Sequence, residues 1–155
     1  MSDIIHARNV YETLCSALDH RGWRYQKEAD DLAVMFGVNG DDLPMKFLIM
    51  VDSERQLIRL LSPLTFNFDD DKKVDAAIAC CVASYKMADG SIDCDLASGR
   101  VTFRMTSAFE NSTVSEELFN YLIDCSCAMV EEYNDKFADI NSGRVSITDF
   151  IENEA

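Results

Sequence analysis

The chain has 155 residues, of which 48% are hydrophobic, and it carries a formal net charge of −14. This length and hydrophobic content predict one domain with its own core and exclude a chain that is disordered throughout. The negative charge disfavours binding to nucleic acid or to an anionic membrane. It favours a basic or amphipathic protein partner, although a charged surface often serves only to keep a protein in solution.

The N-terminus, MSDIIH, has neither the basic start nor the long apolar stretch of a signal peptide. No apolar run approaches the length of a membrane span. We therefore expect a cytoplasmic protein whose six cysteines are reduced. Because the cysteines form no Cys-x-x-Cys pair and the chain has only two histidines, a zinc site is not expected.

The first half of the chain predicts a helix followed by strands. Residues 3–20 carry apolar side chains at helical spacing, and Arg21-Gly22 ends this helix. Four strand-like segments then follow, at residues 23–28, 32–38, 45–52 and 56–62. The connections between them are short, which favours antiparallel neighbours.

Residues 70–88 form the second predicted helix, with one apolar stripe that is expected to face the core. The stripe consists of Val74, Ala77, Ile78, Cys81, Val82 and Tyr85. Small residues flank it and permit close packing: Ala76, Ala79, Cys80 and Ala83. Cys80 and Cys81 are expected in or near the core. Asp69, Asp70 and Asp71 lie at the helix start, where the helix dipole stabilises carboxylates, and a metal site there is the alternative interpretation.

The segment 89–105, DGSIDCDLASGRVTFRM, places three aspartates and a cysteine within seven positions. It raises two alternatives, a metal or acid–base site and a β-hairpin. A two-residue turn at Ser98-Gly99 pairs Asp93 with Arg104 across the strands. It also gathers the apolar residues on one face, namely Ile92, Cys94, Leu96, Val101, Phe103 and Met105. Because alternation points Cys94 away from the neighbouring aspartates, the hairpin is favoured.

Residues 114–138 form a long predicted helix with a wide apolar face. One row is Val114, Leu118, Tyr121, Leu122, Cys125 and Met129, and a second is Phe119, Ile123, Val130, Tyr133 and Phe137. The polar stripe is Glu117, Asn120, Asp124, Cys127, Glu131 and Asn134. Cys127 is therefore the candidate reactive thiol, with an unreactive surface cysteine as the alternative. Its acidic neighbours are expected to raise its pKa and to make it less reactive.

The segment 139–150, DINSGRVSITDF, has some features of an EF-hand calcium loop. Such a loop needs glycine at position 6 and glutamate at position 12. Here the glycine is one position early and the last residue is Phe150. A helix end at Gly143 and a short helix that begins at Ser146 are therefore favoured, and a calcium-responsive protein is the alternative.

The predicted order is α-β-β-β-β-α-β-β-α with a short terminal helix, an α+β fold. A resemblance rests on the hairpin, Asp89-Gly90-Ser91-Ile92-Asp93 through Gly99-Arg100-Val101-Thr102-Phe103-Arg104, and on the long helix that runs into Tyr133, Phe137, Gly143 and Ser146. In these features the chain resembles the YbjN family, described as bacterial sensory transduction regulators. The resemblance covers nearly the whole chain, 1–155, as one YbjN-like domain.

The resemblance implies a type III secretion chaperone-like fold, an antiparallel sheet with helices packed on one face. It also implies dimerisation and binding of segments of other proteins. The family has no catalytic motif to transfer to this chain, and the six cysteines are a departure that the resemblance does not explain.

The third and fourth predicted strands are apolar on both faces. Either the chain's own helices cover both faces, or one face is an interface; only three sizeable helices are available, which favours the interface. We expect partner binding at Leu48, Met50, Leu57 and Leu61.

The function that the sequence favours is a non-enzymatic protein-binding module, chaperone-like or a regulatory adaptor, with no cofactor, metal or catalytic residues. It is expected to form a homodimer. An enzyme is the alternative, but neither His6 nor His20 has a cysteine or serine motif nearby, and the chain has no phosphate-binding glycine loop.

Overall fold

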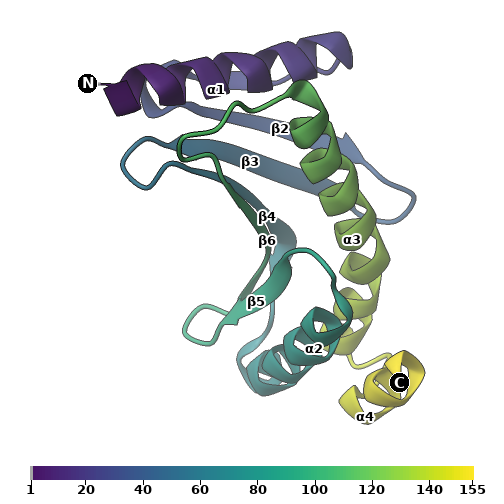
Figure 1. Cartoon of the computed structure of the whole chain (residues 1–155). Helices are drawn as coiled ribbons and strands as arrows, with labels where there is room; N and C mark the ends of the chain where they lie inside the picture. Colours follow the sequence, from purple (N-terminus) through teal and green to yellow (C-terminus); the bar gives the residue numbers. More distant parts are fainter. Residues whose placement is uncertain (1) are drawn as a thin grey trace.

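The computed structural model describes residues 2–155 (Figure 1). Its helices are α1 (Ser2–His20), α2 (Lys73–Lys86), α3 (Glu116–Ser142) and α4 (Ile147–Glu154). Its strands are β1 (Gln26–Glu28), β2 (Ala33–Asn39), β3 (Pro44–Asp52), β4 (Leu57–Asn67), β5 (Ser91–Asp95) and β6 (Arg100–Ala108). Short 3-10 turns, η1 (Ala29–Asp31) and η2 (Asp70–Lys72), follow β1 and precede α2. This element order is the one that the sequence predicts.

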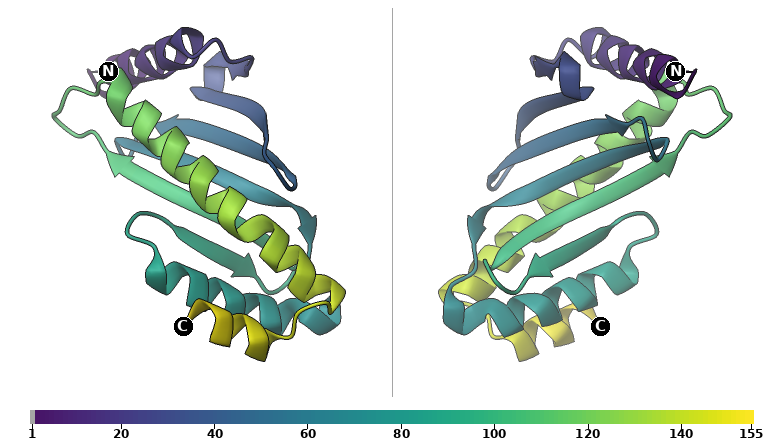
Figure 2. Two further views of the ribbon diagram at one scale, coloured as in Figure 1. Left: turned by 90° about the vertical axis from the view of Figure 1, so that its right-hand side faces the viewer. Right: turned by 90° about the vertical axis from the view of Figure 1, so that its left-hand side faces the viewer.

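The strands form one antiparallel sheet in the order β1-β2-β3-β4-β6-β5. Helix α3 crosses one face of the sheet diagonally, with α1 beside it at the β1–β2 end and α2 and α4 at the β5 edge (Figure 2, left). Among residues 2–155, no helix lies over the opposite face (Figure 2, right). The prediction of an α+β fold with helices on one face is therefore confirmed.

The core lies between the sheet and the helices, because alternate strand residues point toward them. The buried sheet residues include Val34, Phe36, Phe47, Ile49, Ile58, Leu60, Val101 and Phe103. Helix α1 contributes Leu14 and Leu18, and α3 contributes Phe119, Ile123 and Phe137. A sheet with a single buried face needs helices on one side only, so this core leaves the second face free.

Two of the first four strands differ by more than one residue in length from the sequence prediction. β1 has only three residues rather than the predicted 23–28. Trp23 lies before the strand and packs edge-on against Phe36, with ring centroids 5.6 Å apart. β4 runs five residues past the predicted end at Ser62, and its pairing with β6 continues across an irregularity between Pro63 and Asn67. The extension adds Pro63 to the uncovered face.

The β5–β6 hairpin exists, but its register differs from the predicted one by two residues. Asp95 lies opposite Arg100 and Asp93 opposite Thr102, so the loop is four residues long rather than two. A shift of two residues keeps every side chain on its own face, because the side-chain period of a strand is two. Asp93 and Arg104 still form an ion pair of 2.6 Å, now on the diagonal. Leu96 lies in the loop and is exposed rather than buried.

Helix α2 buries the opposite face from the one that was expected. The residues in contact with the core are the small ones, Ala76, Ala79, Cys80 and Ala83. Val74, Ile78, Tyr85 and Cys81, from the predicted apolar stripe, are exposed. The reason is close packing against the edge of the sheet: the Ser84 hydroxyl accepts from the Ile92 amide (2.9 Å) and donates to the Ile92 carbonyl (3.0 Å). Larger side chains on this face would hold the helix too far away to make these bonds.

Helix α3 is longer than predicted and buries its second apolar row together with Leu122, Ser126, Asn134 and Ile140. For Tyr121 and Asn134 the predicted burial is the reverse of the observed one. Tyr121 is exposed and its hydroxyl donates to the carboxylate of Asp89, whereas Asn134 is buried and donates to the Leu43 carbonyl (3.4 Å). Asn134 is tolerated there because the bond satisfies its amide.

The tail forms the two helix ends that the sequence favours. Gly143 has φ of +80° and ends α3, with its amide donating to the Ile140 carbonyl. The Ser146 hydroxyl accepts from the Asp149 amide (3.1 Å) and begins α4. Asp139 pairs with Arg144 at 3.5 Å. The residues 139–150 thus form a helix–turn–helix connection.

Candidate protein-binding surface

The four residues predicted to bind a partner all lie on the face of the sheet that no helix covers. Leu48 and Met50 come from β3, and Leu57 and Leu61 from β4; each is half-buried. Their immediate neighbours along the strands, such as Ile49 and Leu60, are fully buried on the other face. The alternative that the chain's own helices cover both faces of these strands is therefore wrong.

A hollow of about 540 Å³ lies on this face. Its lining includes Met35, Leu48, Leu61 and Pro63 from three strands that are neighbours in the sheet. Met35 lies opposite Leu48, and Leu48 lies opposite Leu61, so these three side chains form one row across the sheet. Side chains at directly opposite positions are close enough to form one continuous apolar surface.

The hollow contains two of the four predicted residues. Leu48 and Leu61 line it, whereas Met50 and Leu57 lie on the same face farther along the strands. The sequence prediction missed Met35, Pro63 and the polar lining. The alternation of residues in β2 places Met35 on the face of the sheet away from the buried Val34 and Phe36. It does not show that Met35 lies next to Leu48, because that depends on the pairing of the strands.

The charged residues that line the hollow are Lys46 and Arg100, both exposed. Within residues 2–155 neither side chain forms an ion pair. Asp95 lies opposite Arg100, but its carboxylate accepts from the Ala97 amide (3.1 Å) and the Ser98 hydroxyl (2.7 Å) in the hairpin loop. These bonds lower the pKa of Asp95, that of Ser98 having the largest effect.

The environment of Cys127 disfavours its thiolate form. Cys127 is half-buried against the core rather than exposed, and burial raises its pKa to about 11. Arg21 opposes this shift, while Asp124 and Glu131 add to it. The predicted direction is thus confirmed, but burial contributes more than the acidic neighbours. Burial likewise raises the pKa of Cys80 to about 12.

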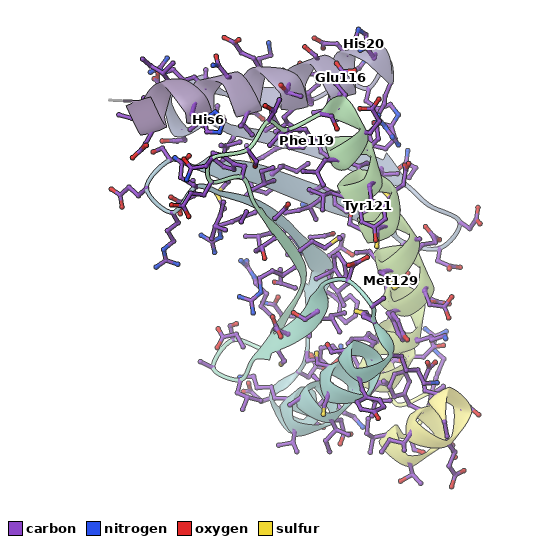
Figure 3. All side chains as sticks on the ribbon, in the orientation of Figure 1. His6, His20, Glu116, Phe119, Tyr121 and Met129 are labelled. Atoms are coloured by element: carbon purple, nitrogen blue, oxygen red, sulfur yellow. The ribbon has the colours of Figure 1, made fainter. Side chains whose placement is uncertain are left out.

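Both histidines hold α1 in place. The His6 ring lies 3.3 Å from the Phe109 carbonyl, measured from Nε2, and packs edge-on against the Phe109 ring. His20 Nδ1 lies 2.9 Å from the Glu116 carboxylate, where the end of α1 meets the start of α3 (Figure 3). These contacts give the two side chains a structural role at opposite ends of one helix.

The aspartate run 69–71, considered as a metal site from the sequence, has a local partner in Lys73. Asp70 forms an ion pair with Lys73 at 2.7 Å, and this hydrogen bond lowers the pKa of Asp70. Within residues 2–155, no group of three or more His, Cys, Asp or Glu side chains is arranged to hold a metal ion.

None of the helices within residues 2–155 has both the length and the hydrophobicity that a membrane span requires.

Comparison with known proteins finds a similarity of structure but none of sequence. No family model matches the chain, and no curated protein matches its sequence. Among solved structures, it is similar to a chain of the crystal structure of the ExsC-ExsE complex, with a TM-score of 0.58 and 13% sequence identity. The alignment covers 82% of this chain and 92% of that chain. At this identity the similarity concerns the fold, and it supports the type III secretion chaperone-like architecture.

Proposed function

We propose that the chain is a chaperone-like module that binds a segment of another protein on the uncovered face of its sheet. The observation that carries this proposal is the hollow of about 540 Å³ with an apolar row across its floor, on a face without helices. Leu48, Met50, Leu57 and Leu61 are the residues that we propose to contact the partner. The similarity to a chain from a complex of two proteins supports a protein partner.

The remaining parts of this proposal follow the resemblance to the YbjN family. Residues 1–155 act as one domain of a regulatory or adaptor protein in the cytoplasm. The activity is binding rather than catalysis, and what supports this is the structural use of His6, His20 and the buried thiols. Within residues 2–155, neither histidine is hydrogen-bonded to a hydroxyl or thiol that it could activate as a nucleophile.

The proposal includes a homodimer. It is supported by a second apolar surface on the outer side of α2, where Val74, Ile78 and Tyr85 are 68%, 37% and 91% exposed. A two-fold pairing buries the same surface on both copies, so one apolar stripe suffices to make an interface. The uncovered face of the sheet then stays available for the partner.

The net charge of the chain supports a partner that is basic or amphipathic as a whole, because the long-range field attracts such a molecule. The contact itself depends on the local charges at the hollow, which are basic.

The test is affinity capture from the native lysate with the full chain, followed by mass spectrometry and reconstitution with each purified candidate. The double variant Leu48→Asp/Leu61→Asp is expected to lose the partner, because two carboxylates in the apolar row oppose burial. Ile4→Asp/Ile5→Asp is the matched control, since both residues are exposed on α1, far from this row along the chain, and the variant adds the same two charges. A reconstituted partner that binds the double variant and wild type equally would contradict the proposal.

A further inference from the structure

The uncovered face has a local charge that differs from the charge of the whole chain. The chain has 28 acidic and 14 basic residues. On the inner strands β3, β4 and β6, however, the charged side chains of the uncovered face are mainly basic: Lys46, Arg59, Arg100 and Arg104. The excess of acid that characterises the rest of the surface is therefore absent from the middle of this face.

These cations are placed around the apolar row. Lys46 and Arg100 line the hollow itself, Arg59 lies opposite Met50, and Arg104 lies opposite Leu61. Arg104 is neutralised by Asp93, but Lys46, Arg59 and Arg100 form no ion pair within residues 2–155.

The acidic residues of this face lie at its margins. Glu28 is on the edge strand β1, and Asp93 and Asp95 are on the opposite edge strand β5. Asp52, at the end of β3, accepts from the amides of Glu54 and Arg55 in the turn. None of these four carboxylates lines the hollow or forms an ion pair with Lys46 or Arg100. Asp93 and Asp95 line a smaller neighbouring hollow, which shares Leu61 and Arg100 with the first.

A second copy of the same face is a poor occupant for the hollow. Two copies placed face to face would bring the unpaired Lys46, Arg59 and Arg100 of both chains together, and like charges at an interface oppose association. An apolar segment with acidic side chains has the opposite property, because it fills the row and pairs with the cations at the same time.

We propose that the occupant of the hollow is a protein segment in which apolar anchor residues alternate with carboxylates. The apolar side chains pack on Met35, Leu48 and Leu61, and the carboxylates pair with Lys46 and Arg100. This inference rests on the proposed function and adds the chemistry of the bound segment. It assigns a locally acidic sequence to the contact region, whatever the charge of the rest of the partner.

The experiment uses short fluorescein-labelled peptides of equal length and the full chain, with binding followed by fluorescence anisotropy. One peptide alternates leucine and glutamate, a second leucine and lysine, and a third serine and glutamate. We expect wild type to prefer the leucine–glutamate peptide. Lys46→Glu/Arg100→Glu should weaken that peptide roughly tenfold and favour the leucine–lysine peptide. Arg8→Glu/Arg24→Glu changes the net charge equally at exposed positions and should change binding less than about twofold.

The other outcomes separate this inference from the proposed function. A stronger leucine–lysine complex that Leu48→Asp abolishes would overturn the acidic segment and keep the protein-binding role. Equal binding of the serine–glutamate peptide would show an anion site without apolar anchoring and overturn the inference. If no complex responds to Leu48→Asp, the proposed function fails at this face. If Leu48→Asp dissociates a wild-type oligomer, the occupant is a second copy and the inference is wrong.

Discussion

Leu48 on β3 and Leu61 on β4 lie directly opposite each other, on the face of the sheet that no helix covers. Leu60, the neighbour of Leu61 in the chain, points to the other face and is 0% exposed. One strand therefore supplies the core and the candidate binding surface with alternate residues. Leu60 and Leu61 are the same amino-acid type at adjacent positions but have different roles, so they are a matched pair for experiment.

Replacing each of the two β4 leucines by alanine should separate stability from binding. Leu60→Ala leaves a cavity in the core and is expected to lower the free energy of unfolding by about 2–5 kcal/mol. Leu61→Ala removes a half-buried side chain from the surface and should cost about 1 kcal/mol or less. Urea denaturation followed by circular dichroism measures both. Equal losses of stability would contradict an uncovered face.

The C-terminal helix is expected to detach in acid. Burial alone would raise the pKa of Glu154, but the hydrogen bond and charge of Lys136, 2.8 Å away, outweigh it and lower the pKa below its ordinary 4.5. Because the folded pKa is the lower one, this contribution is fully present above pH 4.5 and is lost as the pH falls through the folded value. Hydrogen exchange of the α4 amides between pH 6 and pH 3 should show the loss.

Glu154→Gln provides the comparison for this pH dependence. The amide keeps the shape of the side chain but has no charge to lose, so the acid-induced increase in α4 exchange should become smaller. Tyr133, whose hydroxyl donates to Glu154, keeps an acceptor in this variant. An unchanged pH profile would show that other carboxylates control the docking of α4.

Replacing Gly99 by alanine should cost more stability than replacing Gly22. Both have positive φ, +75° and +70°. A Cβ at Gly99 would overlap the carbonyl oxygen of Phe68, but one at Gly22 would meet no atom within 4 Å. Gly22→Ala is thus expected to cost about 1–2 kcal/mol from the backbone alone. Gly99→Ala should cost roughly 1–3 kcal/mol more, and thermal unfolding of the two variants checks the difference.

The thiols should react in an order set by exposure and ionisation. Cys81 is exposed on α2, whereas Cys127 and Cys80 have pKa values raised to about 11 and about 12. At pH 7.5 the thiolate fraction of Cys127 is then below about one in a thousand. Limited alkylation with iodoacetamide and peptide mapping should find Cys81 modified first. Early modification of Cys127 would contradict its burial against the core.

The proposed homodimer should depend on the outer side of α2. Ile78→Glu/Tyr85→Asp is expected to give a monomer in light scattering, because the two charges lie on the exposed apolar stripe. At a concentration so low that wild type is also monomeric, the variant should unfold at nearly the wild-type temperature, since these side chains are outside the core. A wild-type monomer at high concentration would remove this part of the proposal.

The elements and their faces could be predicted from the sequence wherever local periodicity decides them. In the β5–β6 hairpin the prediction placed Ile92 and Phe103 on the buried face correctly, although the pairing was two residues away from the observed one. The capping of α4 by Ser146 was also predictable, because it requires only residues within one turn. In α2, by contrast, periodicity selected the wrong face.

The sequence by itself therefore determined the order of helices and strands and the doubly apolar character of β3 and β4, since both depend on neighbours along the chain. The tertiary structure decided which α2 face is buried, because Ser84 must approach the Ile92 backbone and only small residues allow that. It also decided that Met35, Leu48 and Leu61 form one row flanked by Lys46 and Arg100. These residues are distant in sequence, and only the strand pairing fixes which of them become neighbours.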